Sequence, residues 1–241
     1  MPAPYWLDSH DDVTQFPPVE LALNEPNGLL AVGGDLSPAR LIAAYRQSIF
    51  PWYSEDQPIL WWSPNPRAVL FPEALHVSRS LRKIIRQKRF NITFDQDFEG
   101  VMTACAEPRS YEQETWISPE IFEAYVALHR LGHAHSVEAW QDDKLVGGLY
   151  GVAIGRIFFG ESMFSREPNA SKVAFVHLTS QLQRWHYRAI DCQVSSKHLH
   201  SLGAIDIPRA DFLSLLKHHR DLPGRPSPWR FDQDINPLPT Q

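Results

Sequence analysis

The 241-residue chain is 43% hydrophobic and carries 23 Lys and Arg against 28 Asp and Glu, so its formal net charge of −5 offers no global attraction for nucleic acid. This length suffices for one large domain or two modest ones, and the only two cysteines, Cys105 and Cys192, exclude a disulfide-stapled miniprotein and favour a reducing compartment. The first residues do not resemble a signal peptide and no apolar run approaches the roughly 20 residues that span a bilayer, so we expect a soluble cytoplasmic protein.

Proline is unevenly distributed, with 11 of the 20 in residues 1–72, four in 73–216 and five in 217–241. Because proline fixes φ and lacks a backbone donor, the first of these segments should be rich in turns with few regular elements. We therefore predict a small Pro- and aromatic-rich N-terminal domain over residues 1–66. A larger domain over 67–241 should end in a frayed Pro-rich tail.

Helix caps and apolar periodicity predict the remaining elements in chain order. Ser37 and Pro38 mark the start of one helix, and a second begins at Ser118 and stops at Gly132. Alternation and turn residues then predict an antiparallel meander of three strands. The later predicted elements are strands over 135–140, 144–153 and 156–163, a helix over 171–186, a strand over 189–195 and a helix over 211–219. Strands crossed by helices, with hairpins among them, indicate an α+β fold of the α/β-sandwich type.

The most basic segment covers residues 79–89, with six Lys or Arg and no acidic residue. Leu81, Ile84 and Ile85 have helical spacing, so their side of a helix can dock against the core. The basic side chains that would then project outward are Arg82, Lys83, Arg86 and Arg89. A solvated surface helix and a contact to a phosphate backbone both remain open. Without this segment 17 basic residues face 28 acidic ones, so the molecule is strongly dipolar.

Two neighbouring strands, over residues 147–151 and 158–164, contain glycines, but they contain neither a P-loop nor a dinucleotide-binding fingerprint. Alternation along the second of them places Phe159, Glu161 and Met163 on one face and Phe158 on the other. A carboxylate among Phe and Met must find partners or shift its pKa. Glu161 is therefore either a functional group or a structural carboxylate held by the backbone.

Asp191 and Gln193 lie two residues apart in a short apolar strand, so both point to one face and can contact one reacting group. Cys192 points to the opposite face and suggests a thiol nucleophile with a histidine base. A lone cysteine in a strand is more often a small core hydrophobe, however.

Histidines and tryptophans suggest two further kinds of site. His129, His133 and His135 could bind a metal, but no second ligand pair stands nearby at zinc spacing, which favours structural or surface roles. Tryptophans would belong to the core if buried and would offer stacking platforms for bases if exposed. The tryptophans in question are Trp52, Trp61, Trp62 and Trp116.

Together these segments resemble the bacterial leucyl/phenylalanyl-tRNA–protein transferase family. The resemblance covers roughly residues 16–215, and its strings are specific enough to exclude chance. The matching strings occupy residues 25–36, 49–52, 61–67, 115–117, 132–136, 145–151, 159–165, 169–172, 190–193 and 201–204.

The resemblance implies a two-domain protein whose larger domain is similar to the GNAT (acetyltransferase) fold. Enzymes of the family transfer Leu or Phe, and less readily Met, from aminoacyl-tRNA to a protein N-terminus that begins with Arg or Lys. The product is marked for degradation by the N-end rule. The expected partners are Leu-tRNA, Phe-tRNA and proteins with N-terminal Arg or Lys. No metal, coenzyme or membrane is expected. The protein is expected to be a monomer.

By the same resemblance, Asp191 and Gln193 form the central catalytic pair. Asp191 would orient Gln193, whose amide oxygen would accept a proton or hydrogen bond from the attacking amine. Glu161 would hold the positive groups of the acceptor or assist that relay. Alternatively, the tRNA ribose hydroxyl removes the proton and these side chains only position the substrates.

The resemblance also assigns binding residues. The aminoacyl pocket is expected to contain Leu149, Phe158, Met163 and Phe175. Leu149 and Phe175 replace a methionine and a leucine of the family pattern, which leaves the ranking of Leu, Phe and Met open. The terminal adenosine is expected between Trp52 and Trp116. The acceptor stem of the tRNA is expected on the basic residues of segment 79–89.

Two other functions remain as alternatives. The first is a catalytically silent tRNA- or RNA-binding module, against which Glu161, Asp191 and Gln193 argue. The second is a coenzyme-dependent N-acetyltransferase. It is disfavoured because the chain lacks the loop with which related folds bind the pyrophosphate of coenzyme A.

Overall fold

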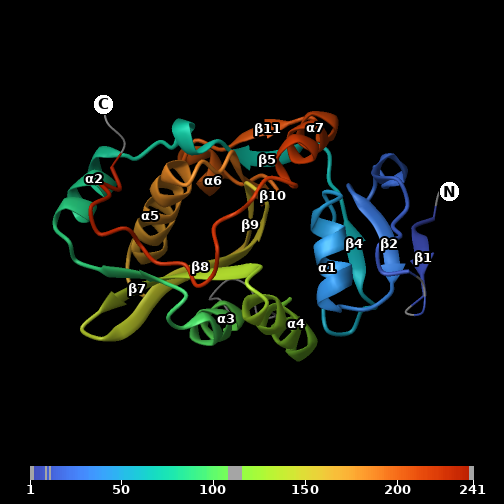
Figure 1. Cartoon of the computed structure of the whole chain (residues 1–241), viewed down its shortest axis with the longest axis horizontal. Helices are drawn as coiled ribbons and strands as arrows, with labels where there is room; N and C mark the ends of the chain where they lie inside the picture. Colours follow the sequence, from blue (N-terminus) through green and yellow to red (C-terminus); the bar gives the residue numbers. More distant parts are fainter. Residues whose placement is uncertain (1–2, 9, 11, 108–115, 239–241) are drawn as a thin grey trace.

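The computed structural model describes residues 3–8, 10, 12–107 and 116–238, which contain two β-sheets. The first sheet has four strands in the order β1-β2-β4-β3. Its strands are β1 (Tyr5–Leu7), β2 (Leu29–Gly33), β3 (Phe50–Pro51) and β4 (Leu60–Trp62). They are short, as the density of prolines predicts, and the helix α1 (Pro38–Tyr45) lies between this sheet and the rest of the molecule (Figure 1).

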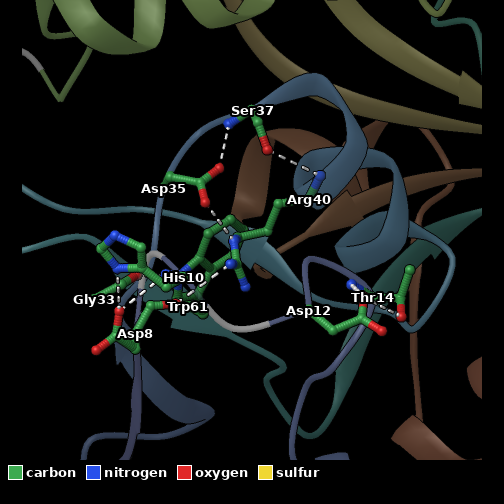
Figure 2. Close-up of polar contacts among 9 residues, drawn as sticks. All are labelled: Asp8, His10, Asp12, Thr14, Gly33, Asp35, Ser37, Arg40 and Trp61. Atoms are coloured by element: carbon green, nitrogen blue, oxygen red, sulfur yellow. Dashed lines mark hydrogen bonds and ion pairs between the residues drawn. The ribbon is translucent and has the colours of Figure 1, made fainter.

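The predicted start of α1 is confirmed, because the Ser37 hydroxyl accepts a hydrogen bond from the backbone N–H of Arg40. Figure 2 shows how the turn before the helix is held. The Asp35 carboxylate accepts from the Ser37 backbone at 2.7 Å and from Arg40 Nε at 3.0 Å. The indole of Trp61 donates to the carbonyl of Gly33 at 2.9 Å. Side chains therefore replace the backbone partners that this turn lacks.

The second sheet has seven strands in the order β11-β5-β10-β9-β8-β7-β6. Its strands are β5 (Arg67–Leu70), β6 (Asn91–Phe94), β7 (Ala134–Gln141), β8 (Lys144–Ile154), β9 (Ile157–Ser165), β10 (Ala189–Gln193) and β11 (Ile205–Ile207). The antiparallel meander predicted from alternation is confirmed as β7-β8-β9. β10 then pairs parallel to β9 and antiparallel to β5, so the sheet is mixed.

Helices cover both faces of the larger sheet, with α5 on one face and α3 and α4 on the other (Figure 1). The helices of this part are α2 (Arg79–Arg86), α3 (Phe98–Ala106), α4 (Pro119–Arg130), α5 (Ala170–Arg184), α6 (Lys197–Ser201) and α7 (Arg209–His219), with a short 3-10 turn at Pro72–Ala74; another 3-10 turn, Val19–Leu21, lies between β1 and β2. Mixed sheets layered with helices agree with the predicted α+β class. No helix of the described part of the chain is long and apolar enough to cross a membrane.

Two sequence predictions need correction. The basic helix stops at Arg86, because Lys88 adopts a positive φ of 51°, so Arg89 does not belong to it. The C-terminal segment is not frayed over its described part. Trp229 is only 1% exposed there, because aromatic side chains of the larger sheet and its helices surround it.

The two sheets share one hydrophobic core. A single cluster of buried side chains joins Leu7 and Trp61 of the first sheet to Tyr150, Phe159 and Phe212 of the larger part. β4 ends at Trp62 and β5 begins at Arg67, so the chain passes from one sheet to the other within this short stretch. The domain boundary between residues 66 and 67 stays a prediction.

Candidate active site

A cavity of about 970 Å³ opens where β3 and β4 of the first sheet face β8, β9 and β10 of the second. It brings together most of the side chains that the sequence analysis assigned to chemistry and binding. These are Trp52, Trp116, Leu149, Phe158, Glu161, Met163, Phe175 and Gln193. Asp191 and the four basic residues do not line it.

A β-bulge in β9 shapes this cavity. Glu161 has no partner on β8, because the register between the two strands shifts by one residue at this point. The extra residue reverses the alternation of side chains beyond it. Met163 therefore packs on the same side as Phe158, and the prediction that it shares a face with Phe159 is wrong.

The bulge completes an apolar pocket on the α5 face of the sheet. Leu149, Phe158 and Phe175 are almost fully buried, and Met163 packs against the same cluster while remaining partly exposed to the cavity. These four side chains come from β8, β9 and α5. Such a wall accepts an apolar side chain and gives a charged one no partner.

Glu161 points to the other side of the sheet, into a hydrogen-bonded chain. Its Oε2 accepts from the Tyr125 hydroxyl at 3.1 Å, and its Oε1 accepts from Gln193 Nε2 at 2.9 Å. The Tyr125 hydroxyl in turn accepts from Tyr45 of α1 at 2.5 Å. Burial raises the pKa of Glu161 to about 7, although the nearby tyrosine hydroxyls and Gln193 stabilise the carboxylate and oppose the shift. The carboxyl group therefore exchanges its proton near neutral pH.

Asp191 is completely buried and forms an ion pair with Arg67. Arg67 Nε donates to Oδ1 at 2.8 Å and Nη2 donates to Oδ2 at 2.6 Å, in a two-pronged ion pair. Asp191 Oδ1 also accepts from the backbone N–H of Gln193 at 2.9 Å. Asp191 thus contacts Gln193 through the backbone, at a residue whose φ of 62° is left-handed.

The side-chain amide of Gln193 faces the cavity with a defined orientation. Its nitrogen donates to Glu161, so its oxygen is the atom left to accept a hydrogen bond from a molecule in the cavity. The strand bulges again between Asp191 and Gln193 where it pairs with β5. This second irregularity lies between the two residues that strict alternation would place side by side.

Three residues of this arrangement were missed by sequence reasoning. Arg67 ends one of the specific strings, but a basic residue there gives no sign that it is buried against Asp191, 124 positions away. Tyr45 and Tyr125 each lie on the apolar stripe of a predicted helix. Their hydroxyl groups were the only signal, since a buried tyrosine hydroxyl needs a partner.

The alternatives based on cysteine and histidine receive no support from the geometry. Burial raises the pKa of the Cys192 thiol, which disfavours the nucleophilic thiolate. His135 Nδ1 donates to the Asp95 carboxylate at 2.8 Å, and the His135 ring stacks on Trp229, while His133 precedes β7. In the described ranges there is no cluster of three or more potential metal ligands.

The tryptophans divide into core and cavity residues. Trp61 is fully buried and belongs to the core. Trp52 is 47% exposed at the cavity, and its carbonyl accepts from the indole of Trp62 at 2.6 Å. Trp116 also lines the cavity. Trp62 lines the cavity as well, and the assignment of the terminal adenosine to Trp52 and Trp116 stays a prediction.

The basic residues of segment 79–89 differ in their surroundings. Lys83 and Arg86 are exposed on the last turn of α2, where positive charge is favourable. Arg82 Nε donates to the carbonyl of Val77. Arg89 forms an ion pair with Glu167 at 2.9 Å. Of the four residues predicted to contact tRNA, Lys83 and Arg86 are therefore the two that project from the helix into solvent.

Comparison with known proteins decides the family. The profile described as leucyl/phenylalanyl-tRNA protein transferase matches residues 69–217, and the profile of its N-terminal domain matches 34–65. The chain belongs to this family. Proteins named leucyl/phenylalanyl-tRNA–protein transferase are similar over nearly their whole length. The one from Pseudomonas syringae pv. syringae (strain B728a) is 61% identical over 90% of this chain and 94% of its own, and the one from Azotobacter vinelandii (strain DJ / ATCC BAA-1303) is 62% identical over 88% and 94%.

Other members of the family extend the similarity. The transferase from Aromatoleum aromaticum (strain DSM 19018 / LMG 30748 / EbN1) is 60% identical over 95% of each chain. A solved structure of a functionally unknown conserved protein from Staphylococcus epidermidis ATCC 12228 matches with 11% identity and a TM-score of 0.33 over 66% of this chain and 68% of that one. That likeness is too weak to assign a fold.

Proposed function

We propose that this protein transfers Leu or Phe, and less readily Met, from aminoacyl-tRNA to the N-terminal Arg or Lys of acceptor proteins. The new peptide bond creates a degradation signal read by the N-end rule. The observation that carries the proposal is one cavity that holds both an apolar pocket and the hydrogen-bonded pair of Gln193 and Glu161. It lies in a chain that belongs to the transferase family.

The aminoacyl ester enters with its side chain in the apolar pocket. A Leu or Phe side chain is unbranched at Cβ and fits among Leu149, Phe158, Met163 and Phe175, whereas a charged side chain would lose its hydration. The terminal adenosine stacks on Trp52 and Trp116. Each aromatic contact of this kind contributes about 1–3 kcal/mol to binding.

Peptide-bond formation needs one amine, one ester and two proton transfers. The acceptor ammonium, whose ordinary pKa is about 7.7–8.0, first gives a proton to Glu161, whose pKa of about 7 is close to it. The free amine then attacks the ester carbonyl while the amide oxygen of Gln193 accepts a hydrogen bond from it. The carbon–oxygen bond to the ribose breaks, and the ribose oxygen leaves with the second proton of the amine.

Asp191 acts on this reaction through Gln193. Both its carboxylate oxygens are occupied by Arg67, and Oδ1 also holds the Gln193 backbone. It is therefore a positioning residue, which keeps the amide oxygen of Gln193 aimed into the cavity. The acceptor stem of the tRNA contacts Arg82, Lys83, Arg86 and Arg89 through its phosphates.

The proposal extends to organisation and location. Residues 1–66 form the small domain and 67–241 the catalytic one, which is GNAT-like. The separate family profiles over 34–65 and 69–217 support the division. The protein acts as a monomer, and it acts in the cytoplasm, where aminoacyl-tRNA is made.

The test is a transfer assay with radiolabelled leucyl-tRNA. Peptides that begin with Arg or Lys should be labelled, and a peptide of the same sequence that begins with Ala should not. Gln193→Ala should lower the rate by about 10²–10⁴, the usual contribution of a positioned proton acceptor. Lys217→Ala, an exposed change on α7, is the matched control and should transfer normally. Wild-type protein that binds the tRNA but labels no peptide would refute the proposal in favour of a silent binding module.

A further inference from the structure

The C-terminal segment reaches the back of the aminoacyl pocket. After α7 the chain returns across the larger sheet toward α2 (Figure 1). It is tied to α5 by a hydrogen bond from Gln181 Nε2 to Asp232 at 2.9 Å and by one from the Ser180 hydroxyl to the Pro237 carbonyl at 2.6 Å. Trp229 lies in the middle of this crossing and is almost completely buried.

Trp229 has a fixed position. Its indole stacks on His135 with ring centroids 3.7 Å apart and an interplanar angle of 5°. Its backbone N–H donates to Asp95 at 2.7 Å, and its indole N–H donates to the carbonyl of Arg225 at 3.2 Å. Stacking and two hydrogen bonds together leave the ring no alternative orientation that keeps all of these partners.

The Phe158 ring lies between Trp229 and the cavity. The two ring centroids are 5.9 Å apart. The far end of the Phe158 ring covers Gly151, where a Cβ atom would approach the ring to 2.5 Å. Trp229 and the glycine backbone therefore hold the ring, which also lines the cavity. In a close-packed interior, the position of Trp229 then sets how far this wall can recede.

We propose that Trp229 is a specificity-determining residue that sets the depth of the aminoacyl pocket by supporting Phe158. It touches no substrate and acts through the ring in front of it. The inference rests on the proposed transfer activity and adds to it the residue that balances Leu against Phe. A smaller residue at 229 leaves space behind Phe158, the ring recedes, and the deeper pocket favours the longer side chain of Phe.

The test compares leucyl and phenylalanyl transfer to one Arg-initiated peptide by wild type, Trp229→Phe and Trp229→Ala. We expect the ratio of kcat/KM for Phe over Leu to rise in that order, by roughly 10-fold for the alanine variant, which corresponds to about one methylene of pocket space. Phe231→Ala is the matched control. Phe231 belongs to the same segment and packs on Phe94 and His177, not on Phe158.

The outcomes separate the inference from the activity. If wild type transfers neither amino acid, the proposed function fails. If wild type transfers both and the folded Trp229 variants keep its ratio, the inference alone fails. An equal shift in Phe231→Ala would also overturn it, because general loosening of the segment would then explain the change. Trp229→Phe decides the matter if the alanine variant does not fold, since it keeps an aromatic ring in the site.

Discussion

The ion pair of Arg67 and Asp191 is a buried pair of charges that also holds the backbone of Gln193. Both side chains are fully buried, and the Arg67 guanidinium also packs on Phe50 and Phe212 and donates to the carbonyl of Ser48. Taking two charges out of water is costly, so such a pair adds little net stability. Its effect here is geometric, because it fixes the strand from which Gln193 projects.

Removing one partner of this pair should be severe. Asp191→Asn leaves the Arg67 charge buried without a counter-charge, and we expect a decrease of about 3–5 kcal/mol in the free energy of unfolding, measured by urea titration. Arg67→Met combined with Asp191→Leu removes both charges and should be less destabilised than the single variant. An Asp191→Asn protein as stable as wild type would show that the pair is not desolvated.

Glu161 should make stability depend on pH. Its pKa is about 7 in the folded protein and near its ordinary value of 4.5 in the unfolded chain. As the pH rises from 4.5 to 7, the Glu161 carboxyl group loses its proton in the unfolded chain but keeps it in the folded protein. The free energy of unfolding therefore decreases as the pH rises through this range. The free energy of unfolding of Glu161→Gln, measured by chemical denaturation, should increase relative to that of wild type by about 2 kcal/mol when the pH is raised from 5 to 8. A constant difference between the two proteins at both pH values would contradict the shift.

At the scale of single elements, the sequence of α2 has both apolar residues at helical spacing and a run of basic residues. Its apolar side is buried through Leu81 and Ile85, as the spacing predicts. Of the basic residues, Lys83 and Arg86 project from the last turn, whereas Arg89 lies beyond the helix. Because Lys83 and Arg86 are exposed to solvent, phosphate oxygens can approach both side chains.

Neutralising this helix should change the salt dependence of tRNA binding. Lys83→Ala with Arg86→Ala should reduce the slope of log K against log salt concentration by about 2, one for each phosphate that is no longer neutralised. Arg130→Ala with Lys217→Ala removes the same charge from exposed positions on α4 and α7 and should leave the slope unchanged. Filter binding across a salt series measures both. An unchanged slope in the α2 variant would make it an ordinary solvated helix.

For the whole molecule, the shared core matters more than the division into two sheets. Tyr45 of α1 packs on Phe159 of β9 with ring centroids 5.0 Å apart and donates to Tyr125 of α4. The Glu161 carboxyl group is thus linked by hydrogen bonds to the helix beside the smaller sheet. Separating the sheets would expose these apolar side chains and break the hydrogen bonds, so neither part should unfold alone.

Unfolding should therefore be cooperative across both sheets. We expect tryptophan fluorescence and far-UV circular dichroism to report one coincident transition in urea. Tyr45→Phe removes one hydrogen bond between the parts and should lower the midpoint by the equivalent of about 1 kcal/mol without splitting the transition. Two separate transitions in the wild-type protein would contradict the shared core.

Local signals in the sequence determined the elements that depend on neighbouring residues. The cap of α1, the stop of α4 at Gly132, the β7-β8-β9 meander and the apolar stripe of α2 follow from side chains within one or two turns. Strings such as 159–165 also determined the family, since they are specific in themselves. β6 and α3 were missed because their short segments carry too little periodicity.

Tertiary structure alone decided how the site is assembled. The bulges in β9 and β10 come from pairing between strands, which local alternation does not encode, and the bulge in β9 moves Met163 to the face opposite the predicted one. The partners Arg67 and Asp191 come from distant parts of the chain, and Trp229 reaches Phe158 only after the C-terminal segment has crossed the sheet. Such contacts depend on burial and register, which exist only once the core has formed.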